Sequence, residues 1–135
     1  MTDWTHYFSH NEIACRCCGV LQVMDTFPDK LLDLREAWEK PMVVNSCCRC
    51  QKHNDSGGGK PASFHLFSQK ALTGIDATCA IDIGTASMTP GERHDFVKLA
   101  MNKGWSIGVA KTFIHLDRRA DYPETKWLNP IIFTY

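Results

Sequence analysis

The sequence contains no run of about 18 or more apolar residues, so nothing in it predicts a membrane-spanning helix. It has no excess of charge of either sign, because 15 Lys and Arg residues stand against 15 Asp and Glu residues. Without a net field, we expect neither nucleic acid nor an anionic membrane as a partner. The first residues, 1–6, lack the basic and then apolar pattern of a secretory signal, so we expect a protein made in the cytoplasm.

The amino-acid composition is typical of a globular protein, with 44% hydrophobic and 22% charged residues. A chain of 135 residues is long enough to bury one proper core. We therefore expect residues 1–135 to form a single domain, and we expect a monomer.

Hydrophobic patterning and capping signals predict an α+β fold. Capping boxes predict helix starts at Ser9–Glu12 and Thr89–Glu92, and helical spacing predicts a helix from Pro28 to Lys40. Short apolar runs predict strands, and turn-forming residues predict a loop at 54–61. The strands expected are 42–45, 79–83, 105–109 and 112–116. This order predicts a small antiparallel sheet with helices packed on one side.

Seven cysteines form two tight clusters, 15–18 and 47–50, with Cys79 apart. An odd number without an export signal argues against a full disulfide framework in the producing cell. Three interpretations remain open: free thiols, a structural zinc bound by thiolates of both clusters, and a disulfide formed after release. The spacings C-x-C-C and C-C-x-C do not match a standard zinc ribbon or knuckle.

Two imidazoles and one carboxylate, those of His65, Asp82 and His115, each lie between bulky apolar residues. In an extended segment such a polar side chain points away from its apolar neighbours. Two His and one Asp can hold one zinc ion and leave its fourth position open, which is typical of a catalytic rather than a structural zinc. If the three converge, the chain is a small metallohydrolase.

Several motifs surround these residues in a recognisable order: Val44–Cys50, Lys52–Asn54, Gly57–Gly58, Ser63–His65, Ala80–Ile83 and Phe113–Asp117. Together they resemble the zinc D-Ala-D-Ala carboxypeptidase and L-Ala-D-Glu endopeptidase family, which shares its fold with Hedgehog domains. The opening Phe8–Glu12, followed by cysteines, is similar to small phage and prophage members. The resemblance covers nearly the whole chain and implies the Hedgehog/D-Ala-D-Ala peptidase-like form of the α+β fold.

The resemblance implies roles for individual residues. His65, Asp82 and His115 would be the zinc ligands, and Ser63 would contact the substrate. Arg49 stands where the family carries an arginine that steadies the substrate or the tetrahedral intermediate, a role that suits a permanently charged fork.

The chain also departs from the family pattern. An insertion, 66–78, separates His65 from Ala80 and makes Asp76 a rival of Asp82 as ligand. Cys47 and Cys48 replace the commoner Gly-Tyr before the arginine. Where many members carry an acidic residue or His shortly before the last ligand, this chain has Thr112 and Phe113.

Two residues are therefore candidates for the general base. Asp117, two residues after His115, is either the base or the partner that orients His115, and a salt bridge with Arg118 or Arg119 is the alternative interpretation. His53 is the second candidate, against an exposed loop histidine.

By resemblance we expect a zinc-dependent peptidase that cleaves peptidoglycan stem peptides, an endopeptidase or carboxypeptidase of phage or prophage origin. It would act on the cell wall after release from the bacterial cytoplasm, or be carried in the virion. The alternatives are an inactive zinc-binding or virion-associated module on the same fold and a cysteine-rich redox or metal-storage protein. The sequence does not determine which bond is cut.

Overall fold

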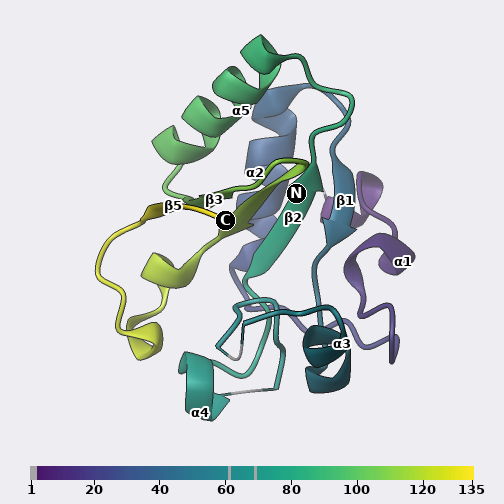
Figure 1. The fold of residues 1–135 in the computed structure, drawn as a ribbon, viewed down its shortest axis with the longest axis vertical. Coiled ribbons are helices and arrows are strands. Elements are labelled where there is room, and N and C mark those ends of the chain that lie inside the picture. The colour runs from purple at the N-terminus through teal and green to yellow at the C-terminus, as the bar shows by residue number, and fades with distance from the viewer. Residues whose placement is uncertain (1–2, 61, 69) are drawn as a thin grey trace.

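A computed structural model describes residues 3–60, 62–68 and 70–135. Met1 and Thr2, Pro61 of the expected loop and Gln69 of the insertion lie outside the described residues. A five-stranded sheet in the order β1-β2-β4-β3-β5 forms the centre of the molecule (Figure 1). The strands are β1 (Val43–Ser46), β2 (Ala80–Gly84), β3 (Ser106–Val109), β4 (Phe113–Asp117) and β5 (Ile132–Thr134).

The sheet is mixed, which corrects the expectation of a wholly antiparallel one. The pairs β1/β2, β2/β4 and β3/β4 are antiparallel, as expected. The unexpected strand β5 returns to the sheet and pairs in parallel with β3, with Ile107 opposite Ile132. The α+β class itself is confirmed.

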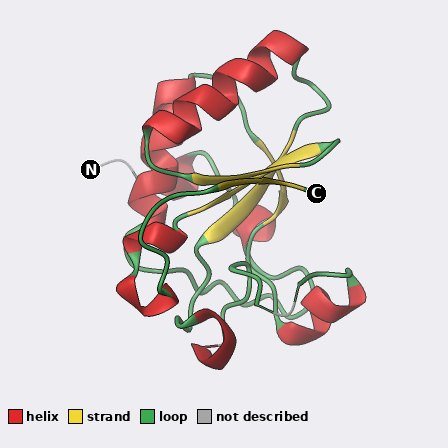
Figure 2. Cartoon of the chain, turned by 60° about the vertical axis from the view of Figure 1, so that its left-hand side comes forward, coloured by secondary structure: helices red, strands yellow, loops and turns green. Residues whose placement is uncertain are grey.

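Two long helices cover one face of the sheet, and the short helices α3 and α4 lie with loops on its other side (Figure 2). The helices are α1 (His10–Ile13), α2 (Phe27–Trp38), α3 (Gln51–Ser56), α4 (Lys70–Thr73) and α5 (Pro90–Asn102), with short 3-10 turns at Trp4–His6, Arg119–Asp121 and Pro123–Thr125. Leu31 and Leu34 of α2 and Phe96 of α5 join the sheet residues Ile81 and Ile83 in one core. Because α2 and α5 pack on this face, the predicted metal ligands lie on the opposite face of the sheet.

Local signals explain where the helices begin and end. Both expected capping boxes are present, with Ser9 and Thr89 as caps of α1 and α5. The helix expected at 28–40 spans Phe27–Trp38, because Glu39 leaves the helix in a left-handed conformation with φ of 62°.

The inserted segment, 66–78, contains one helical turn, α4 (Lys70–Thr73). Its far end is anchored near the N-terminal part of the chain, where Met24 N–H donates to the Thr78 carbonyl and Thr78 N–H to the Gln22 carbonyl, both at 2.9 Å. Helix α3 occupies the start of the expected loop at 54–61. Within the described ranges, no helix has the length and apolarity to cross a membrane.

Candidate metal centre

Two of the three predicted ligands lie opposite each other on adjacent strands. Asp82 on β2 pairs in register with His115 on β4. Directly opposed residues of an antiparallel pair share one face of the sheet. Ile81 and Ile83 point into the core, so Asp82 and His115 project from the other face.

The third predicted ligand, His65, lies in a turn instead of an extended strand. Its carbonyl accepts the Arg49 N–H at 2.9 Å and the Thr78 hydroxyl at 2.8 Å. Its own N–H donates to the Ser63 hydroxyl oxygen at 3.2 Å. These contacts place the imidazole over the β2/β4 pair. The Ser63 hydroxyl oxygen accepts one of these hydrogen bonds, from the His65 N–H.

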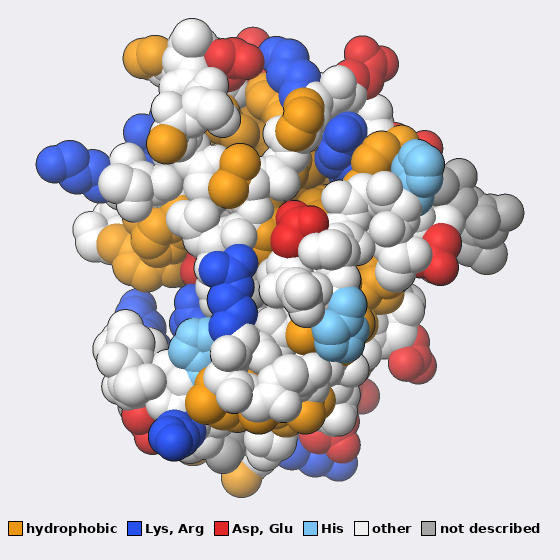
Figure 3. Space-filling model, turned by 90° about the vertical axis from the view of Figure 1, so that its right-hand side faces the viewer, with side chains coloured by type: hydrophobic (Ala, Val, Ile, Leu, Met, Phe, Trp, Pro, Cys, Tyr) orange, Lys and Arg blue, Asp and Glu red, His pale blue; other side chains and the backbone are white. Residues whose placement is uncertain are grey.

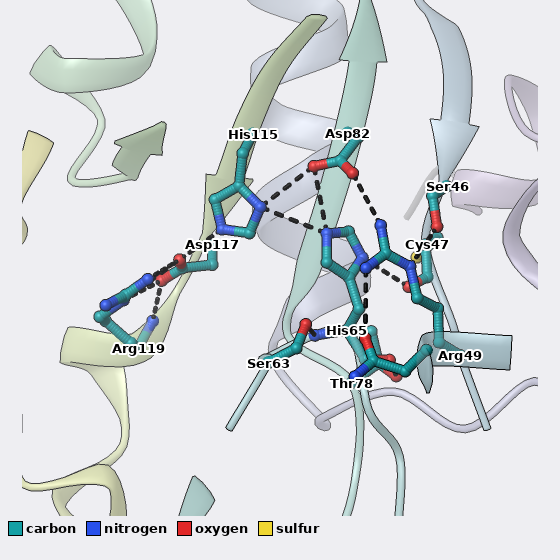
Figure 4. Close-up of polar contacts among 11 residues, drawn as sticks. Ser46, Cys47, Arg49, Ser63, His65, Thr78, Asp82, His115, Asp117 and Arg119 are labelled. Carbon is teal, nitrogen blue, oxygen red and sulfur yellow. Dashed lines mark hydrogen bonds and ion pairs between the residues drawn. The ribbon is translucent and has the colours of Figure 1, made fainter. Parts of the chain in front are cut away.

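The three side chains converge on one point (Figure 4). His65 Nε2 lies 3.1 Å from Asp82 Oδ1 and 3.2 Å from His115 Nδ1. His115 Nδ1 lies 3.0 Å from the same carboxylate oxygen. All three residues are at least 95% buried.

The other contacts of the two imidazoles determine which nitrogens carry protons. His65 Nδ1 is 2.7 Å from the Cys47 carbonyl, which can only accept, and His115 Nε2 is 2.7 Å from the Asp117 carboxylate. In neutral rings both protons therefore lie on these outer nitrogens. The inner nitrogens and the Asp82 oxygen then present three lone pairs to one another, an arrangement that a bound cation, or a proton on His115 Nδ1, stabilises.

The donor set fits zinc. Ligand atoms about 2.0–2.2 Å from a tetrahedral zinc lie about 3.3–3.6 Å from one another. The observed separations of 3.0–3.2 Å need only a small expansion to reach these values. Three protein ligands leave the fourth position open, as in catalytic zinc sites.

Asp117 is enclosed by its partners. Its Oδ2 accepts from His115 Nε2, while Arg119 donates Nε–H and its backbone N–H to Oδ1, both at 2.9 Å, and Nη2–H to Oδ2 at 2.7 Å. Asp117 has no exposed surface. It is positioned to orient His115, and the salt bridge with Arg119 is present as well. Arg118 pairs with Asp121 instead.

Arg49 reaches the site from the chain that follows β1. Its Nη2 donates to Asp82 Oδ2 at 3.0 Å, and its Nε donates to the Ser46 hydroxyl at 2.8 Å. The carboxylate of Asp82 is thus held between the arginine on one oxygen and the two imidazoles on the other. Arg49 side-chain exposure of 19% leaves part of the guanidinium open to the cavity.

The surroundings favour the metal-binding protonation states of His65 and Asp82, but not that of His115. Burial lowers the pKa of His65 below its ordinary value, so that its ring is neutral at neutral pH. Burial opposes ionisation of Asp82, but His65 and His115 outweigh it and hold the pKa of that carboxyl well below its usual range. For His115, burial lowers the pKa, but hydrogen bonds with Asp117 and Asp82 outweigh burial and raise it.

A cavity of about 750 Å³ opens over the three ligands. Arg49, Lys60 and Ser63 line it together with an aromatic wall that the sequence did not reveal: Phe64, Phe113, Trp127, Phe133 and Tyr135. Phe133 lies with its ring centroid 5.6 Å from that of His115. The close approach needs Gly108, since a Cβ there would lie 2.5 Å from the Phe133 ring.

Two predicted candidates lie away from this cavity. His53 contacts Cys15, with 3.6 Å between Nδ1 and Sγ, and is not among the lining residues. Asp76 is exposed and belongs to neither the ligand group nor the lining, so the structure brings Asp82 rather than Asp76 to the histidines. Among the described lining residues, Asp82 is the only carboxylate.

Sequence comparison assigns the chain to a family. A family profile described as peptidase M15 matches residues 6–117, which include His65, Asp82 and His115. The chain belongs to the peptidase M15 family. M15 peptidases are zinc-dependent, so membership supports a metallopeptidase and confirms the resemblance found in the motifs. No curated protein matches the sequence significantly. The match ends at β4, so β5 and most of the aromatic wall lie outside it.

Proposed function

We propose that the protein is a zinc-dependent peptidase that hydrolyses an amide bond in peptidoglycan stem peptides. The observation that carries this proposal is the convergence of His65, Asp82 and His115 beneath an open cavity in a chain of the M15 family. A phage or prophage lytic enzyme remains the role we favour, with a virion-borne enzyme as the alternative.

The chain's own residues would hold the ion and keep its ligands in place. His65, Asp82 and His115 would bind zinc, which polarises a scissile carbonyl and lowers the pKa of water from about 15.7 to about 7. Asp117 keeps the His115 proton on Nε2, so that Nδ1 stays available to the metal. Arg119 in turn keeps Asp117 ionised and fixed.

The charges around the cavity suit an anionic peptide. Asp82 is paired with Arg49. Arg119 lines the cavity, and its partner Asp117 does not. Lys60 adds a further cation at the rim, with Nζ 5.6 Å from the Phe133 ring centroid. Stem peptides carry free carboxylates, which Lys60 and the open side of Arg49 can bind. Arg49 can also stabilise the oxyanion that develops on the scissile carbonyl.

One observation favours a second candidate, a zinc-binding module without peptidase activity, including a virion-associated one. No carboxylate other than Asp82 lines the described part of the cavity, and Asp117 is enclosed by Arg119 and His115. Thr112 and Phe113, at the positions where many relatives carry an ionisable group, cannot take a proton. A peptidase would therefore depend on the metal and Arg49 for most of its rate.

Mass spectrometry of purified muropeptides tests the proposal. Incubation with the protein should produce fragments that show cleavage of one stem-peptide bond, and a chelator or His65→Ala should abolish them. The fragment masses also identify the bond. Bound zinc with no new fragments from any muropeptide would instead support the inactive module.

A further inference from the structure

A second group of metal-ligand side chains lies away from the cavity. The thiols of Cys15, Cys18 and Cys50 all lie within 4.8 Å of one another. His53 Nδ1 lies 3.6 Å from Cys15 Sγ. None of these four residues lines the cavity above His65, so the candidate zinc site described above does not explain the cluster.

The first half of the cluster is a tight turn that begins directly after α1. Gly19 N–H donates to the Cys15 carbonyl at 2.7 Å, and Cys15 N–H donates to the Val20 carbonyl at 2.8 Å. Gly19 has φ of 77°, which a side chain at this position would strain. Cys15 and Cys18 thus have C-x-x-C spacing closed by glycine, which belongs to the spacings of structural zinc sites. Grouping the three cysteines as C-x-C-C concealed this spacing in the sequence.

The second half is the start of α3. Cys50 caps this helix, with His53 N–H 3.4 Å from its Sγ, and Cys50 N–H donates to Cys15 Sγ at 3.3 Å. The loop after α1 and the start of α3 lie close together in Figure 1. Figure 3 shows the face of the molecule on which α1 lies, with histidine side chains at its surface.

We propose that Cys15, Cys18, Cys50 and His53 bind a second, structural zinc ion. Ligands at about 2.0–2.1 Å for nitrogen and about 2.3 Å for sulfur around a tetrahedral zinc leave about 3.5 Å between nitrogen and sulfur, close to the observed 3.6 Å. Three thiolates and one imidazole close the shell, as in structural Cys₃His sites.

The environment of Cys15 supports a metal ligand. Burial by itself raises the pKa of this thiol, but hydrogen bonds from the Cys18 backbone and from His53 outweigh burial and lower the pKa to about 6. The thiolate, the form that binds metal, is then present at neutral pH. A disulfide would join only two of the three converging thiols and leave one unpaired.

The ion would connect two segments that are 35 residues apart in sequence, Cys15 and Cys50. Cys50 follows Arg49, whose guanidinium holds Asp82. The second zinc would therefore fix the backbone from which Arg49 reaches the cavity, without contacting substrate.

Zinc content of the full-length protein, purified under reducing conditions, tests the proposal. We expect two zinc ions per chain in the wild type, one in His65→Ala and one in Cys18→Ser. Cys17→Ser tests the rival fourth ligand, because the Cys17 thiol is exposed and hydrogen-bonded to the Cys50 thiol; with His53 as the fourth ligand, this variant should keep both ions. Retention of two ions in His53→Ala, with loss of one in Cys17→Ser, would overturn the assignment of the fourth ligand.

Cobalt binding keeps the test decisive if Cys18→Ser fails to fold. One equivalent of Co²⁺ added to metal-free His65→Ala should produce near-ultraviolet thiolate-to-cobalt charge-transfer bands, which report sulfur ligands. Absence of these bands in a folded protein would overturn the proposal. So would peptide mapping that finds a disulfide between two of Cys15, Cys18 and Cys50.

Discussion

His115 and Asp117 lie two residues apart on β4, and His115 Nε2 donates to Asp117 Oδ2 across 2.7 Å. Both side chains project from the same face of the strand, as the spacing predicts. The contact fixes the tautomer of His115 and turns Nδ1 toward Asp82 and His65. Arg119 completes the arrangement from the turn that follows β4.

Asp117→Asn should weaken zinc binding at the His65 site by about 10–100-fold, because the charge that orients His115 is lost. Competition with a chromophoric chelator measures this affinity. Asp121→Asn is the matched control, since Asp121 pairs with Arg118 and does not contact His115. Equal zinc affinities of the two variants would contradict the role assigned to Asp117.

Arg49→Lys should impair turnover far more than folding. An ammonium cannot bind Asp82 and Ser46 and also present a fork to the substrate. If Arg49 contacts the oxyanion, the loss is about 2–4 kcal/mol, or about 30- to 10³-fold in kcat/KM. Arg93→Lys, which changes an arginine that binds backbone carbonyls outside the cavity, should leave kcat/KM unchanged. Unimpaired turnover in Arg49→Lys refutes this role.

Gly108→Ala should destabilise the fold, because the new methyl group would overlap the Phe133 ring and lie 3.1 Å from His115 Cβ. Overpacking of this kind costs about 1–3 kcal/mol, measured from urea unfolding. Gly91→Ala is the control, since the nearest atom to its Cβ would be Thr89 Oγ1 at 3.9 Å. If Gly108→Ala were no less stable than Gly91→Ala, Phe133 would not pack over the site as described.

The sequence predicted those parts of the fold that local signals determine. Local signals include the helix caps Ser9 and Thr89, and helices α1 and α5 begin where these caps predict. They also include the short apolar runs around Ile81 and Ile114, which form strands β2 and β4. The candidate ligands His65, Asp82 and His115 were predicted because each interrupts an apolar run and because their order resembles the family pattern. The structure brings the three side chains together.

Tertiary contacts determine most of what the sequence did not predict. Strand β5 lies in a β-branched and aromatic run, 131–135, which is a local strand signal that the prediction did not use. Its parallel pairing with β3 is a tertiary contact that no local pattern predicts. Helix α3 is rich in residues of low helix propensity such as Asn54 and Asp55, and it forms where Cys50 caps it and Asn54 is buried. The aromatic wall consists of residues distant in sequence, so no local pattern could reveal it.

Export should decide whether the protein harms a bacterial cell. Expression in the bacterial cytoplasm alone should cause little lysis, because the peptidoglycan lies outside the membrane. Addition of a secretory signal should make expression toxic, and the exported His65→Ala variant should be harmless. Culture density and viable counts measure the effect. Equal toxicity of the active and His65→Ala forms would show that cell-wall cleavage is not the cause.

Anomalous X-ray diffraction at the zinc absorption edge, on crystals of the zinc-loaded protein, tests the central claim most directly. We expect a strong peak about 2.0–2.2 Å from His65 Nε2, Asp82 and His115 Nδ1, at the base of the cavity. A well-ordered site without that peak, its imidazoles and carboxylate still hydrogen-bonded to one another, would contradict the account.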